Sequence, residues 1–381
     1  MFITFFKKLL HTKFFFNIPS RCDFIIYTDK EKERFFDNLI PNKEIFYIYR
    51  FDYGINIFFL ILCSIVYFYK KITFKEKYFL FISRFYKPKI IITTYDNEIF
   101  FYKLRYITNI DTCIIQNGYR AYYVDVFSKI EKVNIKNFNV TYKFLYGPSI
   151  GKLYDKYLPG KNIYIGSFKN NFIEQSESKK NTTSIGYISQ FRNVKDYLPE
   201  VDVINFLNKY CNENDFQLNV HLLGSSKVFG RAAKILKPEL NFYQNHLNCK
   251  NKIIIRNDSL DNYRSLMNEN IIVNIDSTLG YEMLARRKKI IFFSFRDSNK
   301  KYFGCCDEKS HNFGWPTKYE NTGLCWSNIY DESVLRKILD NAITCEINLW
   351  KKKITEYADN LIKYDYNNNE IKKIINQINE R

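Results

Sequence analysis

The chain has 381 residues, 46% of them hydrophobic, which predicts a folded protein with room for two domains and excludes a disordered one. Its 58 Lys and Arg outnumber 40 Asp and Glu, so the net charge is +18. Because the basic residues are spread along the chain and form no compact module with aromatic residues, we expect no nucleic-acid partner. A solvated basic surface and contact with an anionic membrane or substrate are both compatible with this charge.

Short apolar runs alternate with helical patterns in the first half of the chain. The predicted strands there cover residues 21–28, 44–49, 89–94, 112–116 and 143–146. The predicted helices cover residues 30–39, 55–69, 74–86, 98–106 and 150–157. This alternation is typical of a mostly parallel sheet with helices on both faces.

The most apolar of these helices, 55–69, raises the question of a membrane segment. A membrane-crossing helix needs ~20 apolar residues, and this stretch is shorter and contains Asn56 and Ser64. We therefore interpret it as a buried helix of the first domain, with a helix that dips into the membrane as the alternative. Residues 1–16 are interrupted by lysines and precede no small-residue cleavage site, so no signal peptide is predicted.

A polar segment without large apolar residues, 174–183, separates this half from a second alternation. The later strands are predicted at residues 184–189, 217–223, 252–256, 271–275 and 290–294. The later helices are predicted at residues 201–210, 281–286, 332–344 and 346–364, with another from 367. We divide the chain into a first domain at 1–175, a linker at 176–183, a second domain at 184–345 and C-terminal helices at 346–381.

The cysteines and histidines favour a reducing compartment and no metal site. Nine cysteines are present, an odd number without a C-x-x-C pair, which indicates buried, reduced thiols and a cytoplasmic location. The four histidines lack zinc-ligand spacing, and a metal cluster of Cys305, Cys306 and His311 is less favoured than a structural interpretation. We expect no metal and no cofactor.

The polar turn D-S-T-L-G at 276–280 stands between a predicted strand and a predicted helix. The first backbone N–H groups of a helix lack internal partners and carry the positive end of its dipole, so such a turn can hold a phosphate. Ser277 and Thr278 add hydroxyl donors, and Gly280 allows close backbone approach. We therefore predict a phosphate-binding turn that starts at Asp276.

Further candidates for the same site follow other strands of the second domain. Glu282 is placed to accept hydrogen bonds from sugar hydroxyls, with stabilisation of the helix dipole as the alternative. Arg192 is a candidate bidentate phosphate ligand, with a surface salt bridge as the alternative. Gly224 and Ser225 end a predicted strand and are expected to border a nucleotide.

A family resemblance follows from these motifs. The run D-S-T-L-G-Y-E at 276–282, with L-A-R at 284–286, resembles the nucleotide-binding half of GT-B glycosyltransferases. More narrowly, it is similar to bacterial surface-carbohydrate biosynthesis proteins. Other stretches that fit this family lie at 115–118, 144–151, 165–171 and 188–192. The match breaks at Arg287, where the family has Gly. A left-handed helix end costs roughly 1 kcal/mol for a residue other than Gly, so either the helix ends differently or this cost is tolerated.

The resemblance implies an α/β fold with two Rossmann-like domains facing across a cleft, and a C-terminal helix that crosses back to the first domain. By analogy with inverting members of the family, Asp96 or Glu98 is the expected catalytic base, with a turn or cap role for Asp96 as the alternative. Gln116, Asn117 and Arg120 are expected on the acceptor side. No D-x-D element is present, so the expected mechanism is independent of metal.

The activity implied is glycosyl transfer from a nucleotide-sugar donor, with a CMP-linked acidic sugar as one option, to a surface polysaccharide or lipid-linked acceptor. Peripheral contact with the inner face of the membrane would suit such an acceptor. A nucleotide-sugar epimerase or a CDP-polyol phosphotransferase on the same architecture is the first alternative. The epimerase turn carries two glycines and consecutive glutamates, whereas this chain has only Gly280 and Glu282 there. A non-catalytic, membrane-associated sugar-binding or assembly protein is the second alternative.

Overall fold

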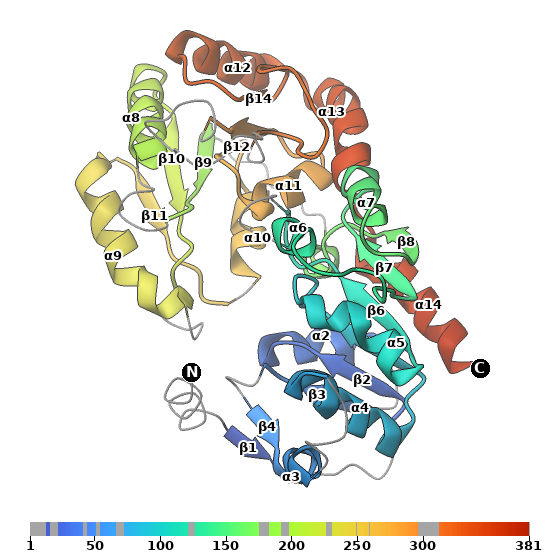
Figure 1. The fold of residues 1–381 in the computed structure, drawn as a ribbon. Helices are drawn as coiled ribbons and strands as arrows, with labels where there is room; N and C mark the ends of the chain where they lie inside the picture. The colour runs from blue at the N-terminus through green and yellow to red at the C-terminus, as the bar shows by residue number, and fades with distance from the viewer. Residues whose placement is uncertain are drawn as a thin grey trace.

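Two α/β lobes, each built on a six-stranded parallel sheet, make up the protein (Figure 1). The computed structural model describes residues 13–15, 22–40, 44–50, 54–65, 72–120, 126–174, 183–191, 198–225, 231–248, 250–258, 260–295 and 312–380.

The first sheet has the strand order β3-β2-β5-β6-β7-β8. Its strands are β2 (Phe24–Tyr27), β3 (Ile45–Ile48), β5 (Ile90–Thr93), β6 (Asp111–Ile115), β7 (Tyr142–Leu145) and β8 (Lys161–Tyr164). The helices of this lobe are α2 (Glu33–Asp37), α3 (Ile57–Ile65), α4 (Phe74–Tyr86), α5 (Leu104–Thr108), α6 (Phe127–Ile130) and α7 (Pro148–Asp155). β2, β5 and β7 are buried along their whole length, as expected for parallel strands covered on both faces.

Within its described residues, this lobe also contains three short 3₁₀ helices and a small separate sheet. The 3₁₀ helices are η1 (Lys30–Lys32), η2 (Ile99–Lys103) and η3 (Asn170–Phe172), and the small sheet pairs β1 (Lys13–Phe15) with β4 (Gly54–Asn56). Local sequence signals explain where elements begin. Helix α4, for example, starts at a capping box, in which the Thr73 side chain accepts from the Glu76 N–H and the Glu76 carboxylate accepts from the Thr73 N–H.

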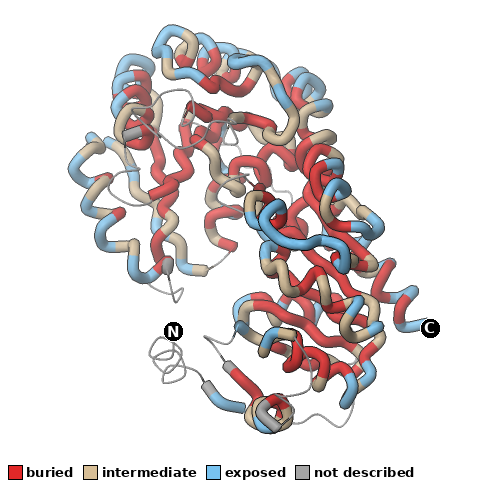
Figure 2. The backbone as a smooth tube through the Cα atoms, in the orientation of Figure 1, coloured by how far each residue is buried: buried red, intermediate tan, exposed pale blue. Residues whose placement is uncertain are grey.

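The second sheet has the order β11-β10-β9-β12-β13-β14. Its strands are β9 (Ser184–Ile188), β10 (Gln217–His221), β11 (Lys252–Ile254), β12 (Ile271–Asn274), β13 (Ile290–Phe293) and β14 (Trp326–Ser327). The helices are α8 (Leu198–Glu213), α9 (Arg231–His246), α10 (Asp261–Met267), α11 (Thr278–Ala285) and α12 (Glu332–Thr344). Buried strands run through both lobes, and the outward faces of the covering helices are exposed (Figure 2).

The end of the chain returns to the first lobe. Helix α13 (Ile347–Leu361) leads from the second lobe to η5 (Tyr366–Asn368) and α14 (Asn369–Asn379), which lies beside the first lobe (Figure 1). Gly166, which follows β8, forms a β-bridge with Tyr364, and the Lys89 ammonium donates to the carbonyl of Asn379 at 2.8 Å. The predicted fold class, including the helix that crosses back, is confirmed.

Several details differ from the prediction or stay open. Helix α11 begins at Thr278 instead of 281, because Ser277 caps it. Strand β8 and helix α9 were not predicted, and α9 contains Pro238, a residue that ordinarily ends a helix. Most of the predicted linker, 176–183, lies outside the described residues, so the domain boundaries stay a prediction.

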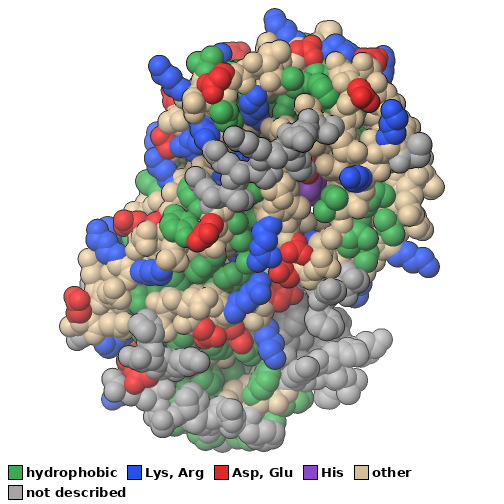
Figure 3. Space-filling view, turned by 180° about the vertical axis from the view of Figure 1, so that it is seen from behind, with side chains coloured by type: hydrophobic (Ala, Val, Ile, Leu, Met, Phe, Trp, Pro, Cys, Tyr) green, Lys and Arg blue, Asp and Glu red, His purple; other side chains and the backbone are tan. Residues whose placement is uncertain are grey.

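Helix α3 covers the described part of the apolar stretch 55–69. Phe59 and Cys63 are fully buried, whereas Ile61 is 53% exposed, so the helix packs with one face against the first lobe. Among the described helices, none is long and apolar enough to cross a bilayer. On the face shown in Figure 3, Lys and Arg side chains are interleaved with acidic ones instead of forming one continuous patch.

The helix end at Arg287 settles the question raised by its missing glycine. Arg287 adopts the left-handed conformation, with φ of 59°, and the Arg287 and Lys288 N–H groups close the helix on the carbonyls of Leu284 and Met283. The Arg287 guanidinium lies 2.7 Å from the Asp359 carboxylate of α13. The backbone cost is therefore tolerated, and this ion pair helps to offset it.

Candidate functional site

A cavity of about 220 Å³ lies between the lobes, where the carboxyl ends of both sheets meet. The first lobe lines it with residues that follow β5, β6 and β8, including Thr94, Gln116 and Lys169. The second lobe contributes residues that follow β9 to β12, including Arg256 and Thr278. This edge of parallel sheets is where α/β proteins bind ligands.

The start of α11 forms one wall of the cavity. Ser277 is its N-cap, and the Ser277 hydroxyl accepts from the Leu279 N–H at 3.2 Å. The Thr278 hydroxyl accepts from the Tyr119 N–H of the first lobe at 3.0 Å. A Cβ atom on Gly280 would clash with the side chain of Asn274, so Gly280 serves the packing of α11 on β12. Of the predicted turn, Ser277, Thr278 and Leu279 line the cavity, whereas Asp276 and Gly280 do not.

Two cations that sequence reasoning missed also line the cavity. The Nε atom of Arg256 is buried and has no hydrogen-bond partner among the described residues. The Lys169 ammonium likewise has no hydrogen bond or ion pair within the described part of the chain, and burial lowers its pKa. Both side chains are half-buried, with carboxylates such as Glu282 and Glu239 nearby. Because neither the ammonium nor the Nε has a hydrogen bond to a described residue, both are suited to an anionic ligand.

Glu282 lies on the same wall, 4% exposed. Its carboxylate accepts from the Ser167 hydroxyl, and the Asn170 side chain donates to its backbone carbonyl at 3.2 Å, so it also ties the lobes together. Burial raises the pKa of Glu282 to about 6, against the opposing effect of hydrogen bonds from Ser167 and Tyr263. Of the described residues that line the cavity, Glu282 carries the one carboxylate.

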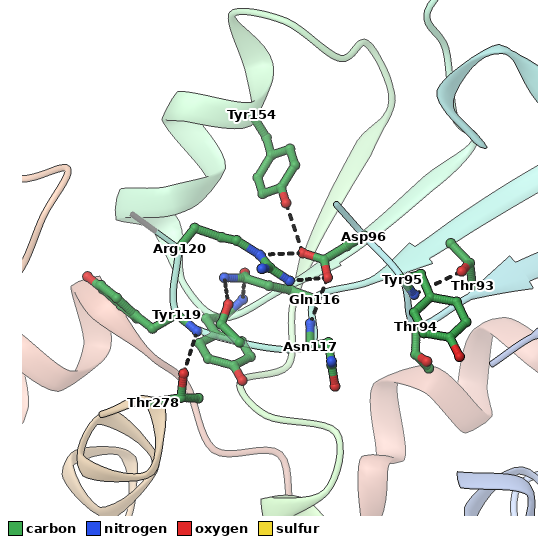
Figure 4. A network of polar contacts seen from close by, with 12 residues as sticks. Thr93, Thr94, Tyr95, Asp96, Gln116, Asn117, Tyr119, Arg120, Tyr154 and Thr278 are labelled. Atoms are coloured by element: carbon green, nitrogen blue, oxygen red, sulfur yellow. Dashed lines mark hydrogen bonds and ion pairs between the residues drawn. The ribbon is translucent and has the colours of Figure 1, made fainter. Parts of the chain in front are cut away.

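Asp96 is fully buried behind the cavity wall and is not among its lining residues. Its carboxylate accepts from Arg120 Nε at 2.8 Å, from the Tyr154 hydroxyl at 3.0 Å and from the Asn117 N–H at 3.1 Å (Figure 4). Glu98 also lies outside the lining and pairs with Lys75 at 2.9 Å. Their catalytic role stays a prediction, but the geometry favours a structural role for both.

The predicted acceptor-side residues have separate roles. The Gln116 side chain donates to the Gly118 carbonyl at 2.9 Å and accepts from the Tyr146 N–H at 2.9 Å, so it braces the backbone of the turn. Arg120 is buried against Asp96. Asn117 lines the cavity and is exposed, so of the three it is the one whose side chain is available to a ligand.

Sequence similarity places the chain in a family. Residues 113–379, more than half of the chain, match the family described as "putative O-antigen biosynthesis protein". The chain belongs to this family. Comparison of the sequence with curated proteins gives no match. The predicted recognition, a GT-B-like surface-carbohydrate biosynthesis protein, is confirmed.

Solved structures similar to this family member share its fold. S. aureus MnaA in complex with UDP has a TM-score of 0.53 at 12% identity, over 93% of this chain and 96% of that one. UDP-GlcNAc 2-epimerase from Methanocaldococcus jannaschii, in complex with UDP-GlcNAc and UDP, has a TM-score of 0.51 at 13% identity, over 94% and 99%. The wall teichoic acid polymerase TagF, soaked with CDPG, has a TM-score of 0.52 at 11% identity, over 94% and 88%. At these identities the likeness establishes the fold alone.

The remaining predicted donor residues lie behind the wall or outside the described residues. The Leu223 and Gly224 N–H groups donate to the Glu239 carboxylate, at 2.9 and 2.6 Å, so an internal anion already occupies the turn. The Ser225 hydroxyl donates to the Arg256 carbonyl at 2.9 Å and thereby anchors the backbone at Arg256. The Asp276 N–H donates to the Gln190 side chain at 3.2 Å. Arg192 lies outside the described residues.

Proposed function

We propose that this protein transfers a sugar from a nucleotide-sugar donor to a glycan or lipid-linked acceptor in O-antigen assembly. The observation that carries the proposal is the meeting of three anion-binding features at one interlobe cavity: the start of α11, the Lys169 ammonium and the unpartnered Nε of Arg256. A nucleoside diphosphate carries the negative charge that all three of these groups can bind.

The residues divide the work of glycosyl transfer between them. Lys169 and Arg256, both half-buried in the cavity wall, stabilise the charge that grows on the departing nucleotide. Thr278 is the first residue of α11, at the positive end of the helix dipole. Its N–H and hydroxyl donate to the same phosphate. Glu282 accepts hydrogen bonds from hydroxyls of the donor. Asn117, on the opposite lobe, contacts the acceptor.

Calorimetric titration with UDP, CDP, CMP and GDP tests the donor site. We expect at least one nucleotide to bind, and Arg256→Ala and Lys169→Ala each to weaken it by about tenfold or more, because a charge-assisted hydrogen bond contributes about 1.5–3 kcal/mol. Lys234→Ala, an exposed lysine on α9, is the matched control. Wild-type protein that binds none of the four, or cation variants that bind like wild type, would contradict the proposal.

Turnover separates transfer from the alternatives on the same fold. A transferase releases free nucleotide only when an acceptor is present. An epimerase converts one nucleotide sugar into another without any acceptor, which proton NMR of the sugar detects. A phosphotransferase releases a nucleoside monophosphate from a CDP-polyol. A binding protein gives none of these products although its nucleotide affinity is intact.

A further inference from the structure

The segment 116–120, which we call the bridging turn, is held from behind by buried polar contacts. Asp96 accepts from the Asn117 N–H at one end of the turn and from the Arg120 guanidinium at the other (Figure 4). Tyr154 holds the Asp96 carboxylate with a hydrogen bond of 3.0 Å. This cluster fixes the turn, since Asp96 is fully buried and each of these contacts involves its carboxylate.

The tip of the bridging turn touches the second lobe at the start of α11. The Tyr119 N–H donates to the Thr278 hydroxyl at 3.0 Å. The Tyr119 ring stacks on Tyr281 with a centroid distance of 3.6 Å and an angle of 2° between the ring planes. The Tyr119 hydroxyl donates to the Trp315 carbonyl at 2.5 Å. The turn is therefore docked against the second lobe at three points, two of them on α11.

The docking has a consequence for the hydroxyl of Thr278. An oxygen that accepts a hydrogen bond from one side keeps its own proton for a partner elsewhere. The same side chain lines the interlobe cavity. Because the Tyr119 N–H donates to the Thr278 hydroxyl from behind, rotation of this hydroxyl is restricted. Its proton is then available to a ligand in the cavity.

We propose that the bridging turn of the first lobe completes the donor site of the second, by orienting the Thr278 hydroxyl toward a bound phosphate, and that Asp96 is the positioning residue of this turn. This inference rests on the proposed function for the identity of the ligand. Donor affinity then depends on contact between the lobes. A substitution in the first lobe changes phosphate binding although the substituted residue does not contact the phosphate.

A double-mutant cycle tests the coupling, with UDP and CDP as probes in calorimetry. We expect Tyr154→Phe and Asp96→Asn to weaken nucleotide binding several-fold, and Thr278→Val to weaken it at least as much. Combined with Thr278→Val, either change should cause no further loss, because both act through the same hydroxyl. Losses that multiply in the double variants would overturn the proposal. Asp111→Asn, a carboxylate at the opposite edge of the same sheet, should leave the affinity unchanged.

Hydrogen exchange provides a readout that needs no nucleotide. The Tyr119 amide should exchange faster in Thr278→Val and in Tyr154→Phe, but not in Thr278→Ser, which keeps the hydroxyl. Unchanged exchange in both of the first two variants would refute the positioning role even if nucleotides bind. If the wild type binds none of the tested nucleotides while these exchange rates shift as expected, the proposed function fails and the docking of the turn stands.

Discussion

Replacement of Glu282 by Gln should make the protein more stable at neutral pH and less able to bind its donor. Burial raises the pKa of Glu282 from an ordinary 4.5 to about 6. The native state therefore favours the neutral carboxyl, and the stability that this form contributes is fully present below pH ~4.5 and is lost as the pH rises through about 6. A difference of about 1.5 pKa units corresponds to about 2 kcal/mol.

Urea unfolding of both proteins between pH 4.5 and 8 measures this effect. Gln keeps the shape of the side chain and an acceptor for the Ser167 hydroxyl but carries no charge. We expect the two proteins to have similar free energies of unfolding at pH 4.5, and the Gln variant to be more stable by about 2 kcal/mol at pH 8. The exposed Glu356→Gln on α13 is the matched control and should change stability by less than about 0.5 kcal/mol.

The reasoning fails if the difference between the proteins does not vary with pH, or if the Gln variant is the less stable one at pH 8. Donor binding provides the second half of the test. The charged Glu282 carboxylate lowers the stability of the folded protein at neutral pH, which is typical of residues retained for function. The more stable Gln variant should therefore bind a nucleotide sugar more weakly. Equal affinity in both proteins would remove Glu282 from the donor site.

Two backbone positions give further predictions. Arg287→Gly and Arg287→Ala both lose the ion pair with Asp359, but only the Gly variant relieves the left-handed backbone strain. The Gly variant should therefore be the more stable of the two by about 1 kcal/mol in urea unfolding. Equal stability of the two variants would argue against strain at this position. Gly166→Ala adds a Cβ at φ of 72° that collides with the Lys363 carbonyl, and should lower stability by more than about 2 kcal/mol. Gly118→Ala, whose Cβ would meet Thr278 at an ordinary 3.4 Å, is its control; similar losses in both would contradict the packing argument.

The local sequence was sufficient to predict most of the architecture. Continuous apolar runs such as Ile90–Thr93 specify buried parallel strands, and their alternation with helices leaves few possible topologies. The presence of α11 was also predictable, because a strand followed by Ser, Thr and Gly indicates a helix N-terminus locally, although the helix begins at Thr278 and not at the predicted 281. Helix α9 was not predicted. It contains Pro238, and proline ordinarily ends a helix.

The candidate site was only partly predictable because its chemistry depends on contacts between distant segments. Sequence alone does not reveal that Asp96 is buried against Arg120, an arrangement that favours a structural role for the residue predicted as a base. Lys169 of the first lobe and Arg256 of the second line the same cavity only because the two lobes meet. Each follows a strand, β8 and β11, and this position was the available signal for both.

The return of α14 to the first lobe has a consequence for synthesis on the ribosome. Its apolar side chains Ile371, Ile374, Ile375 and Ile378 are buried, and Lys89 holds the carbonyl of Asn379. The lobe that is translated first therefore receives its last covering element after the other lobe has been made. Until then its apolar surface is uncovered, and a nascent chain of this protein is a natural client for chaperones that shield such surfaces.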